Sequence, residues 1–301
     1  MKSVLLTAYG DVDKLEIRDV PAPSPGLSEI AVRMSGASIN PIDWKLRSGA
    51  LVAWMPLQLP AALGRDASGV VVAVGPGPAP FPVGTRVMGL VNGGYSEVVV
   101  APVDAWAEVP AGLDLVDAGA LPLVLLTGAQ LIEIGVKPRP ADVVLVTGAL
   151  GSVGRVAVHV AKSHGAEVWA GVRANQRAEA ETLGAYGIVA LDGDVDADKL
   201  PQFDAIADTV GGATVQKMIG SLKPGGTIGT VVGEPQGAKA RGFVVHSLLA
   251  HPDSERLAAL AKDVADGKLI VPIAARLPLS EARDAQLLAQ RGAGGKVVLM
   301  G

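Results

Sequence analysis

Residues 143–154 read Val-Val-Leu-Val-Thr-Gly-Ala-Leu-Gly-Ser-Val-Gly and carry the clearest structural pattern of the sequence. An apolar run of strand length is followed by a glycine-rich turn and then by a segment with helical spacing. Apolar residues recur at helical spacing over 153–161, and Arg155, His159 and Lys162 fall on the other face. Glycines let backbone approach a pyrophosphate, and the positive end of a helix stabilises its charge. The stretch therefore predicts a dinucleotide site with the cofactor-binding residues Gly148, Ala149, Gly151, Ser152, Val153 and Gly154.

The residues after the next strand indicate which dinucleotide binds. That strand is expected at Glu167–Val172, where a site for NAD usually carries an acid for the ribose 2′-hydroxyl. Arg173, Asn175 and Arg177 stand there instead, and no acid follows until Glu179. Guanidinium groups can hold a 2′-phosphate in bidentate fashion, so the sequence favours NADP(H). The alternative for Arg177 is a solvated helix residue.

Composition excludes several classes of protein. The 301 residues carry a net charge of −4 without a block of like charges, which gives nucleic-acid binding no support. With no cysteine, disulfides, iron–sulfur clusters and a thiolate nucleophile are ruled out, and four histidines leave little for zinc, so we expect no metal site. The start of the chain lacks the features of a signal peptide, and we expect a cytoplasmic protein. The apolar stretch 118–131 is too short to span a bilayer and is interpreted as a buried domain junction, so no membrane partner is expected.

The pattern of elements changes along the chain. Residues 1 to about 115 alternate β-type runs with turn signals, at 30–34, 69–74 and 95–101 among others, and predict a small barrel-like domain. From about residue 142, strands at 143–147, 168–172, 188–191, 205–208 and 228–232 alternate with helical segments. This alternation is typical of an α/β fold with a doubly wound parallel sheet. After a helix near 254–266, β-type runs return at 269–271 and 296–300.

Ligands of an open parallel sheet bind beyond the carboxyl ends of its strands. Two further strand ends, at 208–210 and 231–233, are therefore predicted to flank the nicotinamide ribose and carboxamide through Val210, Val232 and Gly233. Simple packing of small residues is the alternative interpretation.

Eight landmarks in order resemble one known family over nearly the whole length. They are Asn40-Pro41-Ile42-Asp43-Trp44 and its continuation, Leu63-Gly64-Arg65-Asp66, Val83-Gly84-Thr85-Arg86-Val87, Gly94-Tyr95-Ser96-Glu97, Leu121-Pro122-Leu123 through Thr127, the glycine turn with Asp208-Thr209-Val210-Gly211-Gly212, Leu222-Lys223-Pro224-Gly225-Gly226 and Gly295-Lys296-Val297-Val298-Leu299. The chain resembles the zinc-independent, quinone oxidoreductase-like branch of the medium-chain dehydrogenase/reductase superfamily. The resemblance implies a GroES-like catalytic domain at 1–120, a Rossmann-type NADP(H)-binding domain at 121–267 and a return to the catalytic domain at 268–301.

One departure from the zinc-dependent enzymes of the superfamily limits the chemistry. They carry His-Glu where this chain has Arg65-Asp66, and their metal sites use cysteines that this chain lacks. A zinc alcohol dehydrogenase is therefore excluded. Without a Lewis acid to stabilise an alkoxide, conjugated acceptors become the natural substrates.

The resemblance also implies residue roles. Asn40 is expected to face the substrate cavity near the nicotinamide and to stabilise an oxyanion, although Asn40-Pro41-x-Asp43 equally reads as a helix start. Some relatives carry tyrosines after this motif, where this chain has Lys45 and Leu51. Lys45 could supply a charge or be a solvent-exposed lysine. Thr127 resembles a nicotinamide-facing threonine, unless its hydroxyl bonds the preceding helical turn.

The implied function is an NADPH-dependent reductase of quinones or α,β-unsaturated carbonyls, commonly a homodimer. An enoyl-thioester reductase and a non-catalytic NADPH-binding redox sensor are the alternatives.

Overall fold

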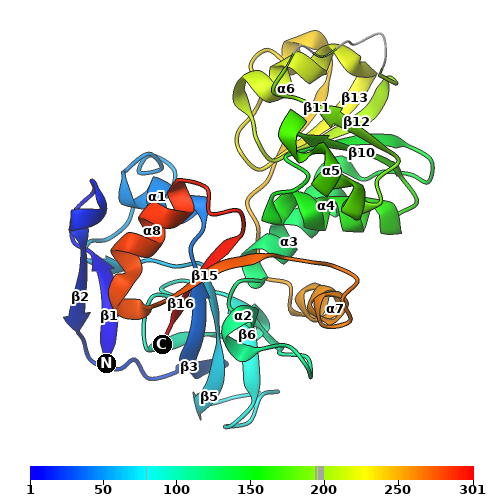
Figure 1. The fold of residues 1–301 in the computed structure, drawn as a ribbon. Helices are drawn as coiled ribbons and strands as arrows, with labels where there is room; N and C mark the ends of the chain where they lie inside the picture. Colours follow the sequence, from blue (N-terminus) through cyan, green and yellow to red (C-terminus); the bar gives the residue numbers. More distant parts are fainter. Residues whose placement is uncertain (79, 194, 196–199) are drawn as a thin grey trace. The chain divides into compact units, whose positions relative to one another are not determined.

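The computed structural model describes residues 1–78, 80–193, 195 and 200–301, which fall into two compact units (Figure 1). The first unit comprises Met1–Leu123 and Pro252–Gly301, and the second comprises Val124–His251. The return to the first unit therefore comes earlier than the expected position at 268. Its cause is α7 (Ser254–Ala265), which packs against β8 (Trp106–Glu108) of the first unit.

The second unit is built on a six-stranded sheet in the order β11-β10-β9-β12-β13-β14, with every neighbouring pair parallel. The strands are β9 (Val143–Thr147), β10 (Glu167–Val172), β11 (Gly187–Ala190), β12 (Phe203–Asp208), β13 (Leu222–Thr230) and β14 (Val244–Ser247). This order confirms the predicted doubly wound sheet. From β9 the chain adds strands on one side, through β10 and β11, and then continues on the other side from β12. Sheets of this kind bind ligands at the point between β9 and β12 where the strand order changes side.

The helices of this unit follow from the pattern of the sequence. They are α4 (Ser152–Ser163), α5 (Arg177–Ala180) and α6 (Gly212–Met218), together with α3 (Pro122–Gln130), which begins in the first unit. The apolar face of α4 is buried through Val156, Val160 and their neighbours, as the spacing predicted. Apolar surface buried against the sheet contributes about 25 cal/mol per Å². For a helix of this length, this burial contributes more to stability than intrinsic helix propensity does.

The first unit is rich in β-structure. A seven-stranded sheet has the order β15-β16-β3-β5-β6-β8, with β7 also pairing β3, and a three-stranded sheet has the order β2-β1-β4. The bounds are β1 (Lys2–Leu6), β2 (Leu15–Asp19), β3 (Glu29–Ser38), β4 (Ala61–Ala62), β5 (Asp66–Val74), β6 (Arg86–Leu90), β7 (Val98–Pro102), β15 (Ile273–Pro278) and β16 (Lys296–Met300). The helices are α1 (Pro41–Arg47), α2 (Leu115–Ala118), α7 and α8 (Ala282–Gln290).

The C-terminal part completes this unit. β16 pairs antiparallel with β3, and Val297 and Leu299 join the core that contains Ile30 and Val32. The expected β-type run at 269–271 is wrong: the strand starts at Ile273, and Ile270 is largely exposed. The expected run at 296–300 is confirmed.

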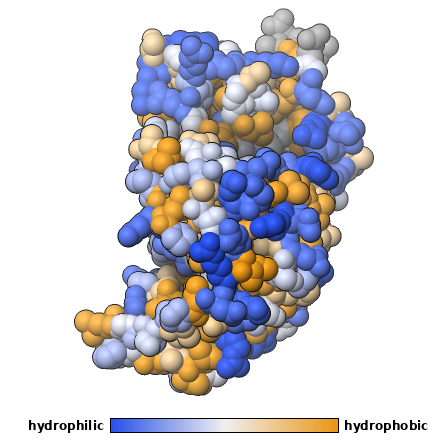
Figure 2. Space-filling view, turned by 90° about the vertical axis from the view of Figure 1, so that its left-hand side faces the viewer, coloured by the Kyte–Doolittle hydropathy of each residue, from blue (hydrophilic) through white to orange (hydrophobic). Residues whose placement is uncertain are grey.

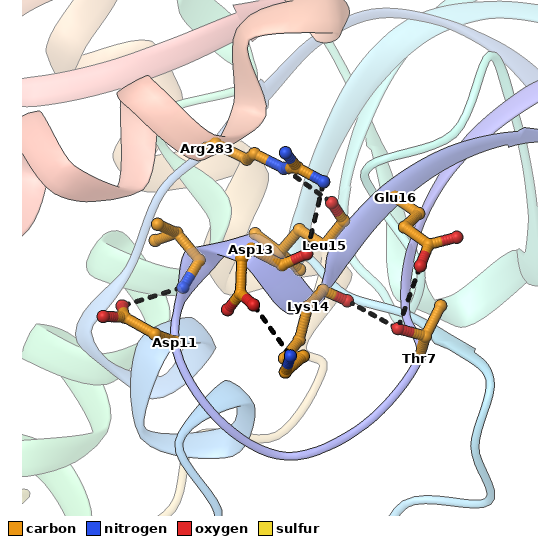
Figure 3. A network of polar contacts seen from close by, with 8 residues as sticks. Thr7, Asp11, Asp13, Lys14, Leu15, Glu16 and Arg283 are labelled. Atoms are coloured by element: carbon orange, nitrogen blue, oxygen red, sulfur yellow. Dashed lines mark hydrogen bonds and ion pairs between the residues drawn. The ribbon is translucent and has the colours of Figure 1, made fainter.

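The N-terminal hairpin is tied to the C-terminal part by Arg283 of α8 (Figure 3). Its Nε donates to Leu15 O at 2.7 Å and its Nη2 to Asp13 O at 3.2 Å. Asp11 caps the turn beside them by accepting the Val12 N–H at 2.8 Å. Residues far apart in the sequence thus close the first unit.

The surface shows no membrane-crossing element in the part that the structure describes: no helix there is long and apolar enough to cross a bilayer. On the face drawn in Figure 2, hydrophilic and hydrophobic residues are interspersed.

Candidate functional site

The glycine turn between β9 and α4 is shaped by two of its three glycines. Gly148 has a φ of +64°, and a Cβ on Gly154 would lie 2.1 Å from Gly148 O, so both positions require glycine. Gly151 has an ordinary φ of −68° and is exposed. Its backbone therefore does not need glycine, and the space beside it remains free for a ligand. The N–H of Ala149 is already used, since it donates to Gly171 O at 3.0 Å.

The N-terminus of α4 offers hydrogen-bond donors beside this turn. The first bond of the helix runs from Arg155 N to Gly151 O at 2.8 Å, so the N–H groups of Ser152, Val153 and Gly154 precede the helical ladder. Three N–H groups at the positive end of a twelve-residue helix can bind an anion. The geometry fits a pyrophosphate, because an exposed glycine lets it approach these donors.

Arg155 is not on a solvent face, contrary to the expectation from helical periodicity. Its side chain is only 8% exposed. Nε donates to Leu150 O at 3.0 Å, and Nη2 forms an ion pair with Glu179. The periodicity was misleading here because a long side chain can extend back along its helix and donate to a carbonyl group of the preceding turn. Glu179, the first acid after β10, is thereby engaged.

The segment after β10 presents the residues predicted to bind a 2′-phosphate. Arg173, Asn175 and Arg177 are all exposed, and the described residues place no carboxylate within 4 Å of either guanidinium. The turn itself is ordered: Arg173 N–H donates to Gln176 Oε1 at 3.1 Å, and Ala174 N–H donates to Asp192 Oδ1 at 2.8 Å. The 2′-phosphate role of the three residues stays a prediction.

Asp208, a buried acid at the end of β12, joins three strand ends. It accepts hydrogen bonds from Thr147 at the end of β9 at 2.7 Å and from Thr230 at the end of β13 at 3.3 Å. It also accepts from the N–H of Gly211 at 2.9 Å. Sequence reasoning placed this residue at a strand end but missed its role. The signal was an acid at the carboxyl end of a mostly apolar strand, aligned with threonines ending two other strands.

Val210 and Val232 project from this network with 48% and 36% of their surfaces exposed. Gly233 beside them has a φ of +110°. Exposed valines at the carboxyl ends of buried strands argue against simple packing, the alternative that the sequence left open, and suit contact with a planar ring. Contact with the nicotinamide stays a prediction.

Thr127 lies on α3 and is half-buried. Among the described residues its hydroxyl has no hydrogen-bond partner, so it does not bond the preceding turn. Its contact with the nicotinamide stays a prediction.

In the first unit, Asn40 is the centre of a buried polar network. Its amide is 1% exposed. Oδ1 accepts from Lys296 Nζ at 2.6 Å, while Nδ2 donates to Asp66 Oδ2 at 2.7 Å and, at 3.2 Å each, to the carbonyl and hydroxyl oxygens of Ser38. The side chain therefore does not cap α1. Pro41 starts the helix as expected, and the Asp43 carboxylate accepts the Asn40 N–H at 2.8 Å.

Asp66 connects this network to α3. Its Oδ1 accepts the N–H of Leu123, in the first turn of α3, at 2.6 Å, and its Oδ2 accepts from Asn40 and Ser38. One carboxylate thus holds both Asn40 and the first turn of α3.

Burial changes the ionisation of this network. Asp43 Oδ2 accepts the Tyr95 hydroxyl at 2.7 Å, and Oδ1 has no partner among the described residues. Burial raises the pKa of Asp43 to about 6, opposed by these hydrogen bonds. Burial also lowers the pKa of Lys296, opposed by Asp66 and Asp43, and raises the pKa of Tyr95 well above its usual value. Lys45 lies outside this network, half-buried, and the described residues give its ammonium no partner.

Comparison with known proteins agrees with this arrangement. Residues 26–111 match the family described as alcohol dehydrogenase GroES-like domain, and residues 183–299 match the family described as zinc-binding dehydrogenase. The chain is 30% identical over 328 residues to a quinone oxidoreductase from Pseudomonas aeruginosa, covering 99% of each. It belongs to the medium-chain dehydrogenase/reductase superfamily, in the quinone oxidoreductase-like branch.

Solved structures of this superfamily share the fold. The quinone oxidoreductase from Coxiella burnetii has a TM-score of 0.90 at 29% identity, with 100% of this chain and 99% of that chain covered. A mycobacterial protein complexed with NADPH has a TM-score of 0.84 at 27% identity, with 100% of both chains covered. The chain is thus an oxidoreductase with a GroES-like domain and a nicotinamide-binding Rossmann domain. One of the two family descriptions mentions zinc. Within the described ranges, no group of three or more His, Asp or Glu side chains could hold a metal ion.

Proposed function

We propose that this protein is an NADPH-dependent reductase of quinones or α,β-unsaturated carbonyls that works without a metal. The observation that carries the proposal is the pairing of a helical anion site at Ser152–Gly154 with exposed, unneutralised arginines after the neighbouring strand. A dinucleotide with a phosphate at both positions matches this charge pattern, whereas NAD(H) has nothing for the arginines to bind. The relatives that are quinone oxidoreductases support the substrate class.

Each part of the cofactor has residues to hold it. The N–H groups of Ser152, Val153 and Gly154 would bind the pyrophosphate, with Gly148 and Gly151 keeping the approach open and Ala149 shaping the turn. Arg173, Asn175 and Arg177 would bind the 2′-phosphate. The nicotinamide end would contact Thr127, Val210, Val232 and Gly233. When bound, NADPH supplies a hydride to an electrophilic carbon or to a quinone oxygen.

The first unit would supply orientation and charge stabilisation. Asn40 holds its amide in one orientation, because Oδ1 faces an ammonium and Nδ2 a carboxylate. One of its N–H groups is held only by the two 3.2 Å contacts to Ser38, the longest of its bonds. That N–H is the weakest-held donor of the amide and is the one that would donate to a substrate oxygen. Lys45 on α1, whose ammonium has no ion-pair partner among the described residues, could supply a charge, and water would supply the proton.

Steady-state NADPH oxidation tests this function with four acceptors: 9,10-phenanthrenequinone, 1,4-benzoquinone, an enone and an enoyl thioester. We expect turnover with the quinones or the enone. Turnover of the enoyl thioester alone would indicate an enoyl-thioester reductase. Tight NADPH binding without any turnover would indicate a non-catalytic NADPH-binding protein.

A further inference from the structure

Arg155 joins the two segments proposed to hold the phosphates of the cofactor. Its Nε donates to Leu150 O inside the glycine turn at 3.0 Å, and its Nη2 pairs with Glu179 on α5. The turn belongs to the proposed pyrophosphate site, and α5 begins at Arg177 of the proposed 2′-phosphate site. A single guanidinium, itself almost fully buried, therefore fixes one segment against the other.

Glu179 is the acid closest in sequence to the arginines of this segment. A carboxylate at the end of the second strand is the group that recognises an unphosphorylated ribose, and it repels a 2′-phosphate. The Glu179 side chain is 57% exposed, so burial does not keep it from a ligand. Its ion pair with Arg155 does, because the pair neutralises the carboxylate and directs it toward α4.

We propose that the Arg155–Glu179 ion pair determines cofactor specificity by keeping this carboxylate away from the 2′-position of the ribose. The proposal rests on the NADPH-dependent function above. Arg155 is a positioning residue, since it acts through Glu179 and through the Leu150 carbonyl. Specificity is a difference between two affinities, so removal of the pair changes the ratio of NADPH to NADH binding more than it changes binding as such.

Calorimetric titration of the full chain with NADPH, NADH, 2′,5′-ADP and 5′-AMP tests the proposal. Arg155→Met removes the cation and releases the acid. We expect the Kd for NADPH and 2′,5′-ADP to rise at least about fivefold, with the Kd for NADH and 5′-AMP changing less than about twofold. Glu179→Gln removes the acid and should leave NADPH binding within about twofold, and the double variant should recover the preference lost in Arg155→Met.

Two further variants keep the test decisive. Glu181→Gln removes the same charge from the neighbouring exposed position, where the described residues show no ion pair, and should leave the ratio unchanged. Glu179→Asp leaves the buried arginine in place while shortening the carboxylate by one methylene. It should lose part of the NADPH preference even if Arg155→Met does not fold.

The outcomes separate the proposal from the function on which it rests. A wild-type protein that binds neither dinucleotide would overturn both. A wild type that prefers NADPH, with Arg155→Met and Glu179→Asp weakening both cofactors equally or not at all, would overturn only the role of the ion pair.

Discussion

At the scale of single residues, Asp43 is a carboxylic acid in a place that favours its neutral form. Its burial, with a smaller contribution from Asp66, raises its pKa to about 6, above the usual value of 3.8. At pH values between 3.8 and about 6, the folded protein therefore keeps a proton on Asp43 that the unfolded chain releases. The stability from this group is complete below pH 3.8 and is lost as the pH rises through about 6.

We predict that Asp43→Asn removes this pH dependence. Between pH 4.5 and 7.5 the wild type should lose about 2 kcal/mol of unfolding free energy relative to the variant. Urea denaturation at both pH values measures the difference. Asp104→Asn, at an exposed position, is the control and should show no such change. A difference of the same size in the control, or a pH-independent difference for Asp43→Asn, would contradict the assignment.

Arg173 carries the second prediction at this scale. Arg173→Ala should weaken NADPH binding by about 1.5 to 3 kcal/mol, the scale of a lost charge-assisted hydrogen bond, and leave NADH nearly unchanged. Quenching of tryptophan fluorescence during titration measures both affinities. The exposed Arg139→Ala, away from the strand ends, serves as the control. Equal losses for the two cofactors would refute the 2′-phosphate assignment.

At the scale of elements, the glycine turn and α4 separate folding from binding. A Cβ at Gly154 would collide with Gly148 O, so Gly154→Ala should cost about 1–3 kcal/mol of stability. A Cβ at Gly151 would lie 3.1 Å from the same oxygen, a tight contact that needs a shift of a few tenths of an ångström, and its φ is allowed for any residue. Gly151→Val should therefore lose less stability than Gly154→Ala and yet bind NADPH at least about tenfold more weakly.

Thermal denaturation with and without NADPH distinguishes these two glycines. Gly154→Ala should lower the melting temperature of the free protein, and Gly151→Val should mainly shrink the increase caused by the cofactor. If Gly151→Val binds NADPH within about twofold of wild type, the turn has no role in cofactor binding.

The elements also show which features sequence patterns can predict. Strands β9 and β10 and the glycine turn were predicted because strand, turn and helix signals are contiguous there. Arg155 was misplaced because periodicity describes where a side chain starts and not where its guanidinium ends. The start of β15 was placed too early because the apolar run before it buries Leu269 and Val271 without pairing as a strand.

At the scale of the whole molecule, the network around Asn40 could not be predicted from local patterns. Lys296 lies 256 residues from Asn40 in sequence, and only the pairing of β16 with β3 brings them together. The resemblance to a family did single out Asn40, and it named Asp66 only within a landmark, but it gave neither residue its partners. Which donors are free and which are engaged is a property of three-dimensional packing.

The metal-independence of the chain is the prediction that belongs to this scale. Without cysteine, and with histidines that do not cluster in the described ranges, the protein should keep its melting temperature and its turnover after dialysis against EDTA or phenanthroline. Activity and thermal denaturation before and after dialysis measure this, with buffer-dialysed protein as control. A fall that added zinc reverses would reveal a metal site.

The insertion of β16 beside β3 also sets an order of events during synthesis on the ribosome. The second unit is one continuous segment, Val124–His251, and has all its strands once that segment has emerged. The first unit has its N-terminal strands from the outset, yet its sheet stays open until Lys296–Met300 is translated. The part made first is therefore completed last, and the β3 edge at Gly36–Ser38, which only β16 covers, must be kept from other nascent chains in the meantime.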